Sequence, residues 1–298
     1  MNRPRFTWDL GSRQLALGGR TLVMGVLNVT PDSFSDGGRY FDTFAAVEHS
    51  LRLLEEGADI LDVGGESTRP NAATAGSKAE FVSEEEELRR VLPVIREIKR
   101  RRADAIISID TYKSGVARAA VQAGAEIVND VSGFHWDAAM PAAIAELRCG
   151  AVLMHTRGRP DEWKTLPPVE DMVAMVSREL GGRANAALRS GIERARLVLD
   201  PGFGFGKRLD ENYPLLARFE EFHALGFPLL AGPSRKSFVG RATSRGGGAA
   251  PAHERMAGSL AAAVLCIMKG AHVVRVHDVK ETVDAAAMAD AVLNNATK

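Results

Sequence analysis

Short apolar runs rich in β-branched residues alternate along the chain with longer segments whose apolar positions recur at helical spacing. This alternation predicts strand, helix, strand units and a parallel sheet, and eight such units can be counted. Several runs are almost continuously apolar, as expected for strands that are covered on both faces. The predicted strands are residues 21–27, 59–64, 105–110, 126–130, 151–155, 196–200, 228–232 and 272–276.

Segments of helical period lie between these runs. The predicted helices are residues 44–56, 84–102, 113–123, 138–147, 169–190, 210–225, 254–269 and 279–295. The second helix begins with a capping box, with Ser83 as the N-cap and Glu86 three residues later. Five glycines fall just after a predicted helix and just before a strand, where a left-handed C-cap is expected. They are Gly57, Gly124, Gly191, Gly226 and Gly270.

Eight strand and helix units without a break in composition predict an α/β fold, a single (β/α)8 TIM barrel. We assign the barrel domain to residues 21–298 and treat residues 1–20 as a short N-terminal extension. A doubly wound open sheet is the alternative. The glycine-rich segment 243–253 is too short to separate two domains, so it is interpreted as a loop.

Composition and charge narrow the classes of function. Hydrophobic residues make up 45% of the chain, and 38 Lys and Arg balance 38 Asp and Glu, so no global field attracts nucleic acid or a membrane. The N-terminus lacks the apolar core of a signal peptide, and the longest apolar stretch, 257–268, is too short to span a bilayer. We therefore expect a soluble cytoplasmic protein. Cys149 and Cys266 lie in apolar surroundings and are predicted to be reduced core residues.

Polar residues gather where the predicted strands end. In a TIM barrel the chemistry lies at the C-terminal ends of the strands, and the opposite ends of these strands carry no comparable set. The residues at the C-terminal ends are Asn28, Gly64–Pro70, Asp110, Asn129, Asp130, His155, Arg157, Asp200, Ser234–Ser237, Arg275 and His277. We expect the active site to be built from them.

The cationic members of this set suggest an anionic ligand. Arg69, Lys236, Arg275 and His277 come from three loops and are suited to holding a phosphate or pyrophosphate, for which Arg offers a bidentate fork.

Three strand-end residues suggest a heterocycle. Asp110, Asn129 and Asp200 stand on rigid backbone and are suited to the edge of a flat amino-heterocycle in an apolar slot. A carboxylate can accept two parallel hydrogen bonds from adjacent ring NH and exocyclic NH2 groups, which selects a guanidine-like edge.

The stretch "GFGFGK", residues 202–207, lacks the spacing of a Walker A motif and of a dinucleotide fingerprint. It is interpreted as a glycine-rich turn that leaves room for a ligand, with Phe203 and Phe205 as walls.

Seven segments in order carry a family resemblance. They are "MGVLNVTPDSFSDGG", "GADILDVGGESTRP", "ISIDTYK", "EIVNDVSG", "LDPGFGFGK", "GPSRKSFVG" and "VVRVHDVKET". With them, the chain resembles the dihydropteroate synthase family over essentially its whole length. The resemblance implies a transferase of folate biosynthesis that joins 6-hydroxymethyl-7,8-dihydropterin pyrophosphate to p-aminobenzoate. Pyrophosphate leaves to give a pterin-methylene cation, and arylamine attack then forms 7,8-dihydropteroate. The resemblance also implies Mg2+ as cofactor, sulfonamide competition and a homodimer. The apolar helix Met256–Met268 is a candidate interface, but a helix that faces only the core would show the same pattern.

The resemblance assigns roles to residues of this chain. The implied pterin contacts are Asp110, Asn129, Asp200, Lys236 and Arg275. The implied pyrophosphate contacts are Asn28, Thr68, Arg69, Arg275 and His277, with Asn28 also the metal ligand. The implied aminobenzoate pocket is Phe34, Pro70, Phe205, Lys236 and Ser237. The implied catalytic residues are Asp36, Arg69, Lys236, Arg275 and His277.

The chain departs from the family pattern at Thr156, Arg157 and Asn71, and the roles of His155, Thr156 and Arg157 stay open. Two other functions also remain possible on the same fold. One is a methyltetrahydrofolate-dependent methyltransferase, which would need neither "TPDSFSDGG" nor "SRKS" because it handles neither pyrophosphate nor aminobenzoate. The other is a non-catalytic homologue that binds pterin.

Overall fold

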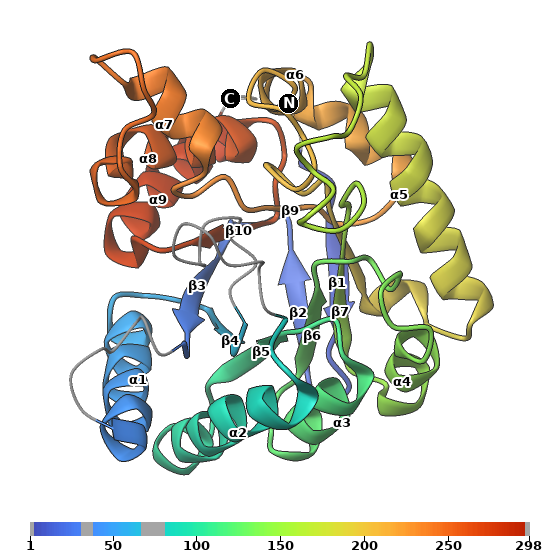
Figure 1. The fold of residues 1–298 in the computed structure, drawn as a ribbon, viewed down its shortest axis with the longest axis vertical. Coiled ribbons are helices and arrows are strands. Elements are labelled where there is room, and N and C mark those ends of the chain that lie inside the picture. Colours follow the sequence, from blue (N-terminus) through green and yellow to red (C-terminus); the bar gives the residue numbers. More distant parts are fainter. Residues whose placement is uncertain (1–2, 31–37, 67–80, 296–298) are drawn as a thin grey trace.

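The computed structural model describes residues 3–30, 38–66 and 81–295. Within these residues eight parallel strands form one sheet, in the order β8, β7, β6, β5, β4, β3, β10, β9 (Figure 1). The strands are β3 (Leu22–Asn28), β4 (Ile60–Gly64), β5 (Ile106–Asp110), β6 (Ile127–Asp130), β7 (Gly150–Met154), β8 (Leu197–Asp200), β9 (Leu230–Ala231) and β10 (Val273–Val276). A parallel bridge between Leu199 and Leu229 brings β8 beside the start of β9. The sheet therefore curls into a nearly closed barrel, which confirms the predicted TIM barrel and makes the open sheet wrong.

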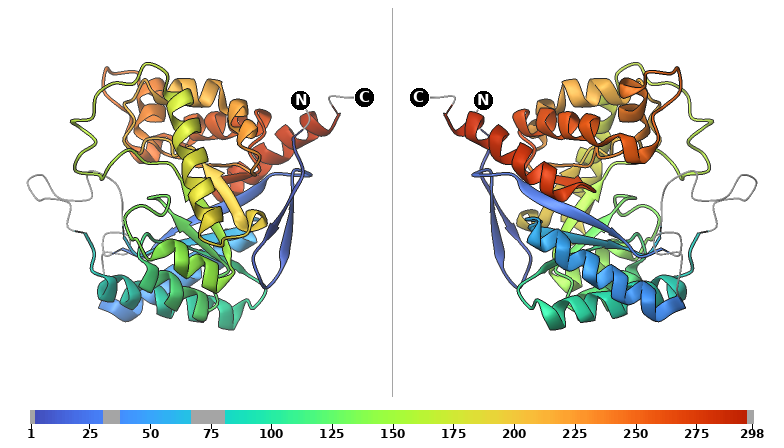
Figure 2. Two further views of the ribbon diagram at one scale, coloured as in Figure 1. Left: turned by 90° about the vertical axis from the view of Figure 1, so that its right-hand side faces the viewer. Right: turned by 90° about the vertical axis from the view of Figure 1, so that its left-hand side faces the viewer.

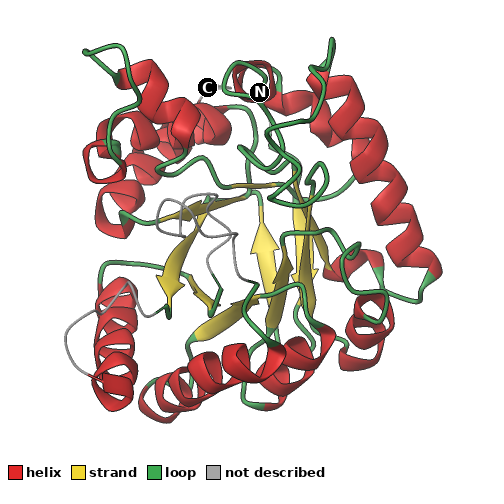
Figure 3. Ribbon diagram, viewed as in Figure 1, coloured by secondary structure: helices red, strands yellow, loops and turns green. Residues whose placement is uncertain are grey.

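Helices surround the strands on the outside, as Figure 3 shows with helices in red and strands in yellow. They are α1 (Gly38–Glu55), α2 (Glu84–Arg101), α3 (Ser114–Gln122), α4 (Met140–Leu147), α5 (Met172–Arg189), α6 (Asn212–Ala217), α7 (Ser237–Thr243), α8 (Met256–Met268) and α9 (Val279–Asn295). Short 3-10 turns lie at η2 (Arg194–Arg196), η3 (Phe219–Leu225) and η4 (Ala252–Glu254).

Local signals mark several helix ends correctly. The Ser83 side chain accepts the backbone N–H of Glu86 at 3.2 Å, as predicted for the start of α2. All five predicted C-cap glycines have positive φ, between 74° at Gly226 and 115° at Gly124, so this prediction is confirmed.

One helix prediction is wrong, and one helix was missed. The predicted helix 210–225 is interrupted at Arg218, whose φ of −118° and ψ of 25° separate α6 from the 3-10 turn η3. Helix α7 was not predicted, because its seven residues are too few to show a helical period.

The inside of the barrel changes character along its axis. Because side chains alternate between the two faces of a strand, every second residue points inward. Near the N-terminal ends these inward residues are apolar and buried together: Leu22, Met24, Ile60, Ile127, Val152, Val198, Leu230 and Val273. One or two inward positions further along lie Asp62, Asp110, Asn129, Asp200 and Arg275. The barrel is thus apolar at one end and charged at the other.

The N-terminal extension closes the apolar end. Strands β1 (Phe6–Asp9) and β2 (Gln14–Leu17) form an antiparallel hairpin. Trp8 and Leu17 from this hairpin are buried in the same cluster as the inward apolar residues. The Trp8 indole N–H donates to the backbone oxygen of Arg196 at 2.9 Å. Figure 2 shows the hairpin in dark blue on one side of the barrel and the connection from β7 to α5, in yellow-green, on the other.

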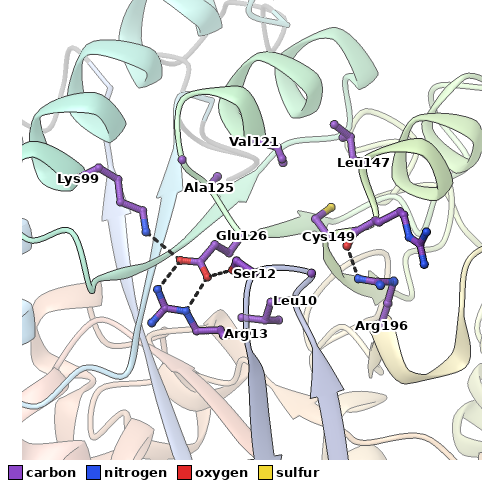
Figure 4. Close-up of a pocket in the computed structure, with 13 residues that line it drawn as sticks. Leu10, Ser12, Arg13, Lys99, Val121, Ala125, Glu126, Leu147, Cys149 and Arg196 are labelled. Carbon is purple, nitrogen blue, oxygen red and sulfur yellow. Dashed lines mark hydrogen bonds and ion pairs between the residues drawn. The ribbon is translucent and has the colours of Figure 1, made fainter.

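The turn of this hairpin borders a cavity of about 670 Å³ (Figure 4). Arg13 Nε and Lys99 Nζ each lie 2.8 Å from the Glu126 carboxylate, which also accepts the Ser12 hydroxyl. Arg196 pairs with Asp9 at 3.0 Å and donates to the backbone oxygen of Arg148. The charged side chains at this cavity therefore attach the hairpin to the base of the barrel, far from the charged end.

Candidate active site

Four neighbouring strands end in register at the charged end of the barrel. Asn28 pairs with Gly64, Gly64 with Asp110, and Asp110 with Asn129. Their side chains therefore start from one level of rigid backbone. This arrangement explains why polar residues that are far apart in the sequence gather at one rim.

Arg275 connects the carboxylates of this rim. Its Nε lies 2.5 Å from Asp62 Oδ2, and its Nη2 lies 2.6 Å from Asp110 Oδ2. The Asn129 side-chain amide donates to the same Asp62 oxygen at 3.1 Å. Burial lowers the pKa of Arg275, but the Asp62 and Asp110 carboxylates outweigh it and raise the pKa above its ordinary value. The guanidinium therefore stays charged inside the barrel.

Asp62 is the member of this network that the sequence reasoning missed. It is fully buried, and its Oδ1 has no hydrogen-bond partner among the described residues. A signal for it was present, because a carboxylate in the middle of the apolar run "ILDVG" requires a buried partner. The periodicity predicts that Asp62 points inward, but it does not predict that Arg275 of a distant strand meets it.

Asp110 and Asp200, at the ends of their strands, have raised pKa values. Burial raises the pKa of Asp110 to about 7, although Arg275 opposes the shift. Burial also raises the pKa of Asp200 to about 6, against the backbone N–H of Gly202, which donates to Asp200 Oδ1 at 2.7 Å. Buried carboxyl groups with raised pKa values are typical of functional sites.

Lys236 and Phe205 meet at the rim. The Lys236 ammonium lies 3.9 Å from the centre of the Phe205 ring, a cation–π distance. The Trp163 ring packs edge-on against the same Phe205 ring, with 5.5 Å between centroids. Ser237 follows Lys236 as the exposed first residue of α7. The structure thus brings together three residues of the predicted aminobenzoate pocket.

The backbone before Lys236 is held in an unusual conformation. Arg235 has a positive φ of 56°. Its guanidinium forms two hydrogen bonds to Asp278, at 3.1 and 2.5 Å. A non-glycine residue in this region costs free energy and persists where the surroundings hold it, often at functional sites. Asp278 therefore fixes the turn from which Lys236 projects.

His277 follows β10 and contacts the same turn. Its Nδ1 lies 3.0 Å from the Ser234 hydroxyl oxygen, and that oxygen accepts the His277 backbone N–H at 3.2 Å. Asn28 lies at the end of β3, which pairs with β10. The predicted pyrophosphate residues Asn28, Arg275 and His277 therefore come from two adjacent strands.

The glycine-rich turn corrects one expectation. Phe203 does not form a wall of the site, because it is buried and stacks against Phe219 and Phe238 beneath the helices. Phe205, two residues later, lies on the other side of the turn beneath Lys236. The turn therefore directs one phenylalanine into the core and the other toward the rim.

The segment after β7 packs against this turn. Arg157 donates to the backbone oxygens of Gly206 at 3.2 Å and of Pro167 at 2.9 Å. His155 is buried, with Nε2 3.1 Å from Glu179, and burial lowers its pKa to about 3, so it is neutral. Thr156 is buried and contacts the backbone oxygen of Gly158 at 3.4 Å.

Five predicted site residues lie outside the described residues. They are Phe34, Asp36, Thr68, Arg69 and Pro70. In the part of the chain that is described, no cluster of three His, Cys, Asp or Glu side chains is arranged to hold a metal ion.

Comparison with known proteins identifies the family. Residues 24–277 match the family described as "Pterin binding enzyme". The chain is 47% identical over 272 residues to the dihydropteroate synthase of Escherichia coli (strain K12). The aligned residues make up 91% of this chain and 92% of that protein. A Xanthomonas albilineans dihydropteroate synthase solved with 4-aminobenzoic acid has a TM-score of 0.86 and 47% identity, covering 97% of this chain and 98% of that one. The same enzyme in complex with 7,8-dihydropteroate gives a TM-score of 0.83 and 45% identity, with the same coverage. Together with the barrel and its charged rim, these similarities show that the chain belongs to the dihydropteroate synthases, transferases of the pterin binding enzyme family.

Proposed function

We propose that the chain condenses 6-hydroxymethyl-7,8-dihydropterin pyrophosphate with p-aminobenzoate, giving 7,8-dihydropteroate and pyrophosphate. The observation that carries this proposal is the charged end of the barrel, where Asp62, Asp110, Asn129 and Arg275 form one network. The family supports it, since relatives of this chain were solved with 4-aminobenzoic acid and with 7,8-dihydropteroate.

The pterin binds among the strand ends. Asp200 accepts hydrogen bonds from the ring NH and amino group of the guanidine-like edge, and Asp110 and Asn129 contact other polar atoms of the ring. Val131 and Met154, which are buried in one apolar cluster beside these residues, provide the slot for a flat ring. Because Asp200 and Asp110 are on strands, the ring is oriented by rigid backbone.

The reaction begins when the bond between the methylene carbon and the pyrophosphate oxygen breaks. The oxygen keeps the electron pair, and the positive charge on carbon is delocalised into the pterin ring. Charge develops on the leaving group, so cationic and N–H donors at its position lower the barrier. Arg275 on β10 and His277, which follows this strand, supply these donors, and Arg69 and Thr68 are assigned to the same role.

The cofactor we propose is Mg2+, with Asn28 as its protein ligand. Asn28 is half-buried at the rim and offers one amide oxygen, a hard donor suited to this ion. Mg2+ usually keeps several waters and takes other ligands from substrate phosphates, so it needs few ligands from the protein. When bound, the ion would neutralise charge on the departing pyrophosphate.

The aminobenzoate amine then attacks the methylene carbon. Its nitrogen lone pair forms the new C–N bond, and the nitrogen afterwards loses a proton to water. Lys236 lies over Phe205, with Ser237 beside it, and these residues hold the aminobenzoate, together with Phe34 and Pro70. Asp36 is assigned near the reacting centre. Sulfonamides would compete at this pocket.

A pyrophosphate-release assay tests the function. We expect pyrophosphate release to require both substrates, because the p-aminobenzoate amine captures the pterin-methylene cation. A methyltransferase would release no pyrophosphate, and a non-catalytic pterin-binding homologue would bind the pterin without turnover. We also propose that p-aminobenzoate binds only after the pterin substrate, and tight binding of p-aminobenzoate to the free enzyme would contradict this order.

We also propose a cytoplasmic homodimer. Two neighbouring helices expose apolar side chains, Met256 and Leu265 on α8 and Met288 and Val292 on α9. Buried residues on the opposite face of α8 pack against the barrel, so this helix serves the core and leaves a second face for a partner. Among the described residues no helix is long and apolar enough to cross a bilayer. Sedimentation of a Leu265→Glu variant tests the dimer.

A further inference from the structure

Lys207 is a buried lysine to which neither the sequence patterns nor the proposed reaction gives a role. Its side chain is 7% exposed, and its ammonium donates to three backbone oxygens. These are Gly202 at 2.7 Å, Phe205 at 3.2 Å and His155 at 3.2 Å. Three N–H donors meet three acceptors, so the charged group is completely satisfied inside the protein.

The turn around this ammonium has a shape that only glycine allows. Gly202 and Gly206 have positive φ values of 69° and 67°. A Cβ atom on Gly202 would collide with the backbone oxygen of His155, and one on Gly206 with that of Arg157. The turn from 202 to 206 is therefore wrapped closely around Lys207 and pressed against the segment after β7.

Two other side chains hold the outside of the same turn. Asn212 accepts the backbone N–H of Gly204 at 2.7 Å, and Arg157 donates to the Gly206 oxygen at 3.2 Å. Lys207 holds the inside, since its ammonium binds the carbonyl of Phe205 itself. The position of the Phe205 ring thus depends on a buried cation below the turn.

Phe205 connects the turn that Lys207 holds to the candidate active site. Its ring lies between the edge-on Trp163 ring and the Lys236 ammonium. The first residue of the turn, Gly202, donates to the Asp200 carboxylate. Asp200 stands on strand β8, so its backbone position does not depend on the turn, whereas that of Phe205 does.

We propose that Lys207 is a positioning residue for the second substrate, because its ammonium fixes the Phe205 turn that forms the floor of the aminobenzoate pocket. It touches no substrate and acts through Phe205. Burial lowers the pKa of Lys207 well below its ordinary value, while the Asp200 carboxylate opposes the shift. Three acceptors can be served only by the protonated group, so the contacts favour the charged form.

The inference rests on the proposed function, and the test separates the two. Wild-type release of pyrophosphate that depends on p-aminobenzoate establishes the function first. The Lys207→Met variant, which keeps most of the unbranched side chain and removes its donors, is then expected to raise the KM for p-aminobenzoate about tenfold to a hundredfold. The KM for the pterin substrate is expected to stay within a factor of about two, since Asp200 is held by its strand.

Two control variants distinguish an effect on p-aminobenzoate binding from a general loss of stability. Lys207→Gln keeps two N–H donors and is expected to give an intermediate KM for p-aminobenzoate. Lys99→Met removes a partly buried lysine with an ion pair at the opposite end of the barrel. It is expected to lower the melting temperature while leaving both KM values unchanged.

A double-mutant cycle with Phe205→Ala decides whether Lys207 acts through Phe205. Adding Lys207→Met to Phe205→Ala should raise the KM for p-aminobenzoate little further. The proposal is overturned if Lys207→Met lowers the melting temperature but leaves that KM at the wild-type value. It is also overturned if the two changes act independently.

Discussion

Arg275 and Asp62 form a buried ion pair, with 2.5 Å between Arg275 Nε and Asp62 Oδ2. The two residues are 213 positions apart in the sequence. Asp62 also accepts the Asn129 amide, and Arg275 also binds Asp110. One carboxylate thus sets the direction of the cation, the amide and, through the cation, a second carboxylate. We regard Asp62 as the residue that orients the pterin end of the site.

Replacing Asp62 by Asn should therefore impair both stability and catalysis. The change leaves the Arg275 charge buried with one partner fewer, and the loss of a buried partner typically costs about 3–5 kcal/mol of unfolding free energy. We expect kcat/KM to fall by about tenfold or more, because Arg275 loses its orientation. Urea unfolding and steady-state kinetics measure the two effects.

The matched control for this variant is Asp59→Asn, at the residue that precedes strand β4. Asp59 pairs with the exposed Arg20 and accepts the backbone N–H of Val23 at 2.9 Å, so this control removes a carboxylate that lies away from the charged end of the barrel. This control should leave kcat/KM unchanged. Wild-type stability and kcat/KM in Asp62→Asn would contradict the orienting role.

Pterin binding should strengthen as the pH rises from about 5 to about 8. The carboxylate form of Asp200 accepts the hydrogen bonds of the pterin edge, and the pKa of Asp200 is raised to about 6 and that of Asp110 to about 7. Below these values the competent form becomes rare, and the affinity falls by up to about tenfold per pH unit for each proton taken up. Calorimetry with the pterin substrate over this pH range measures the effect.

The stability of the free protein should depend on pH in the opposite direction to the pterin affinity. Both carboxyl groups bind a proton more tightly in the folded state than in the unfolded state. Their contribution to the free energy of unfolding therefore decreases as the pH rises from about 4 to about 7. Asp200→Asn should lose the pH step near 6 and weaken pterin binding by about 1–3 kcal/mol. Unchanged affinity in this variant would remove Asp200 from the pterin site.

The N-terminal hairpin should contribute stability and no catalysis. Trp8 is fully buried against the apolar end of the barrel, and replacing it by Ala is expected to cost about 3–5 kcal/mol of unfolding free energy. Urea unfolding measures this loss, and Trp8→Phe should lose less because most of the apolar volume remains. Both KM values should stay at the wild-type level, and a changed KM would show that the hairpin reaches the site.

Magnesium should act through Asn28. Removing the ion with EDTA is expected to weaken binding of pyrophosphate, and added Mg2+ should restore it. In Asn28→Ala the Mg2+ concentration needed for half-maximal pyrophosphate binding should rise by about tenfold or more, since even outer partners of metal ligands contribute this much. Calorimetry gives this readout without turnover. Equal magnesium dependence in the variant and the wild type would place the ion elsewhere.

The alternation of apolar and polar positions predicted most of the fold. Strand periodicity located all eight barrel strands to within about two residues, because a strand covered on both faces leaves a short apolar run whatever its partners are. It also placed Asp110, Asn129 and Asp200 at strand ends, where the barrel gathers its chemistry. Helix ends were visible where a local cap marks them, as at Ser83, and invisible in α7, which is too short for a period.

What the sequence by itself determined is the order of elements and the rim on which the polar residues lie, since both follow from local periodicity and strand direction. Only the tertiary structure decided which of these residues touch. Asp62 meets Arg275 because barrel closure brings β10 beside β3, one strand away from β4. Phe203 points to the core and Phe205 to Lys236. The Lys207 ammonium, which donates to the Phe205 backbone oxygen, holds the turn that carries them. These pairings depend on contacts between distant segments, and no local pattern records them.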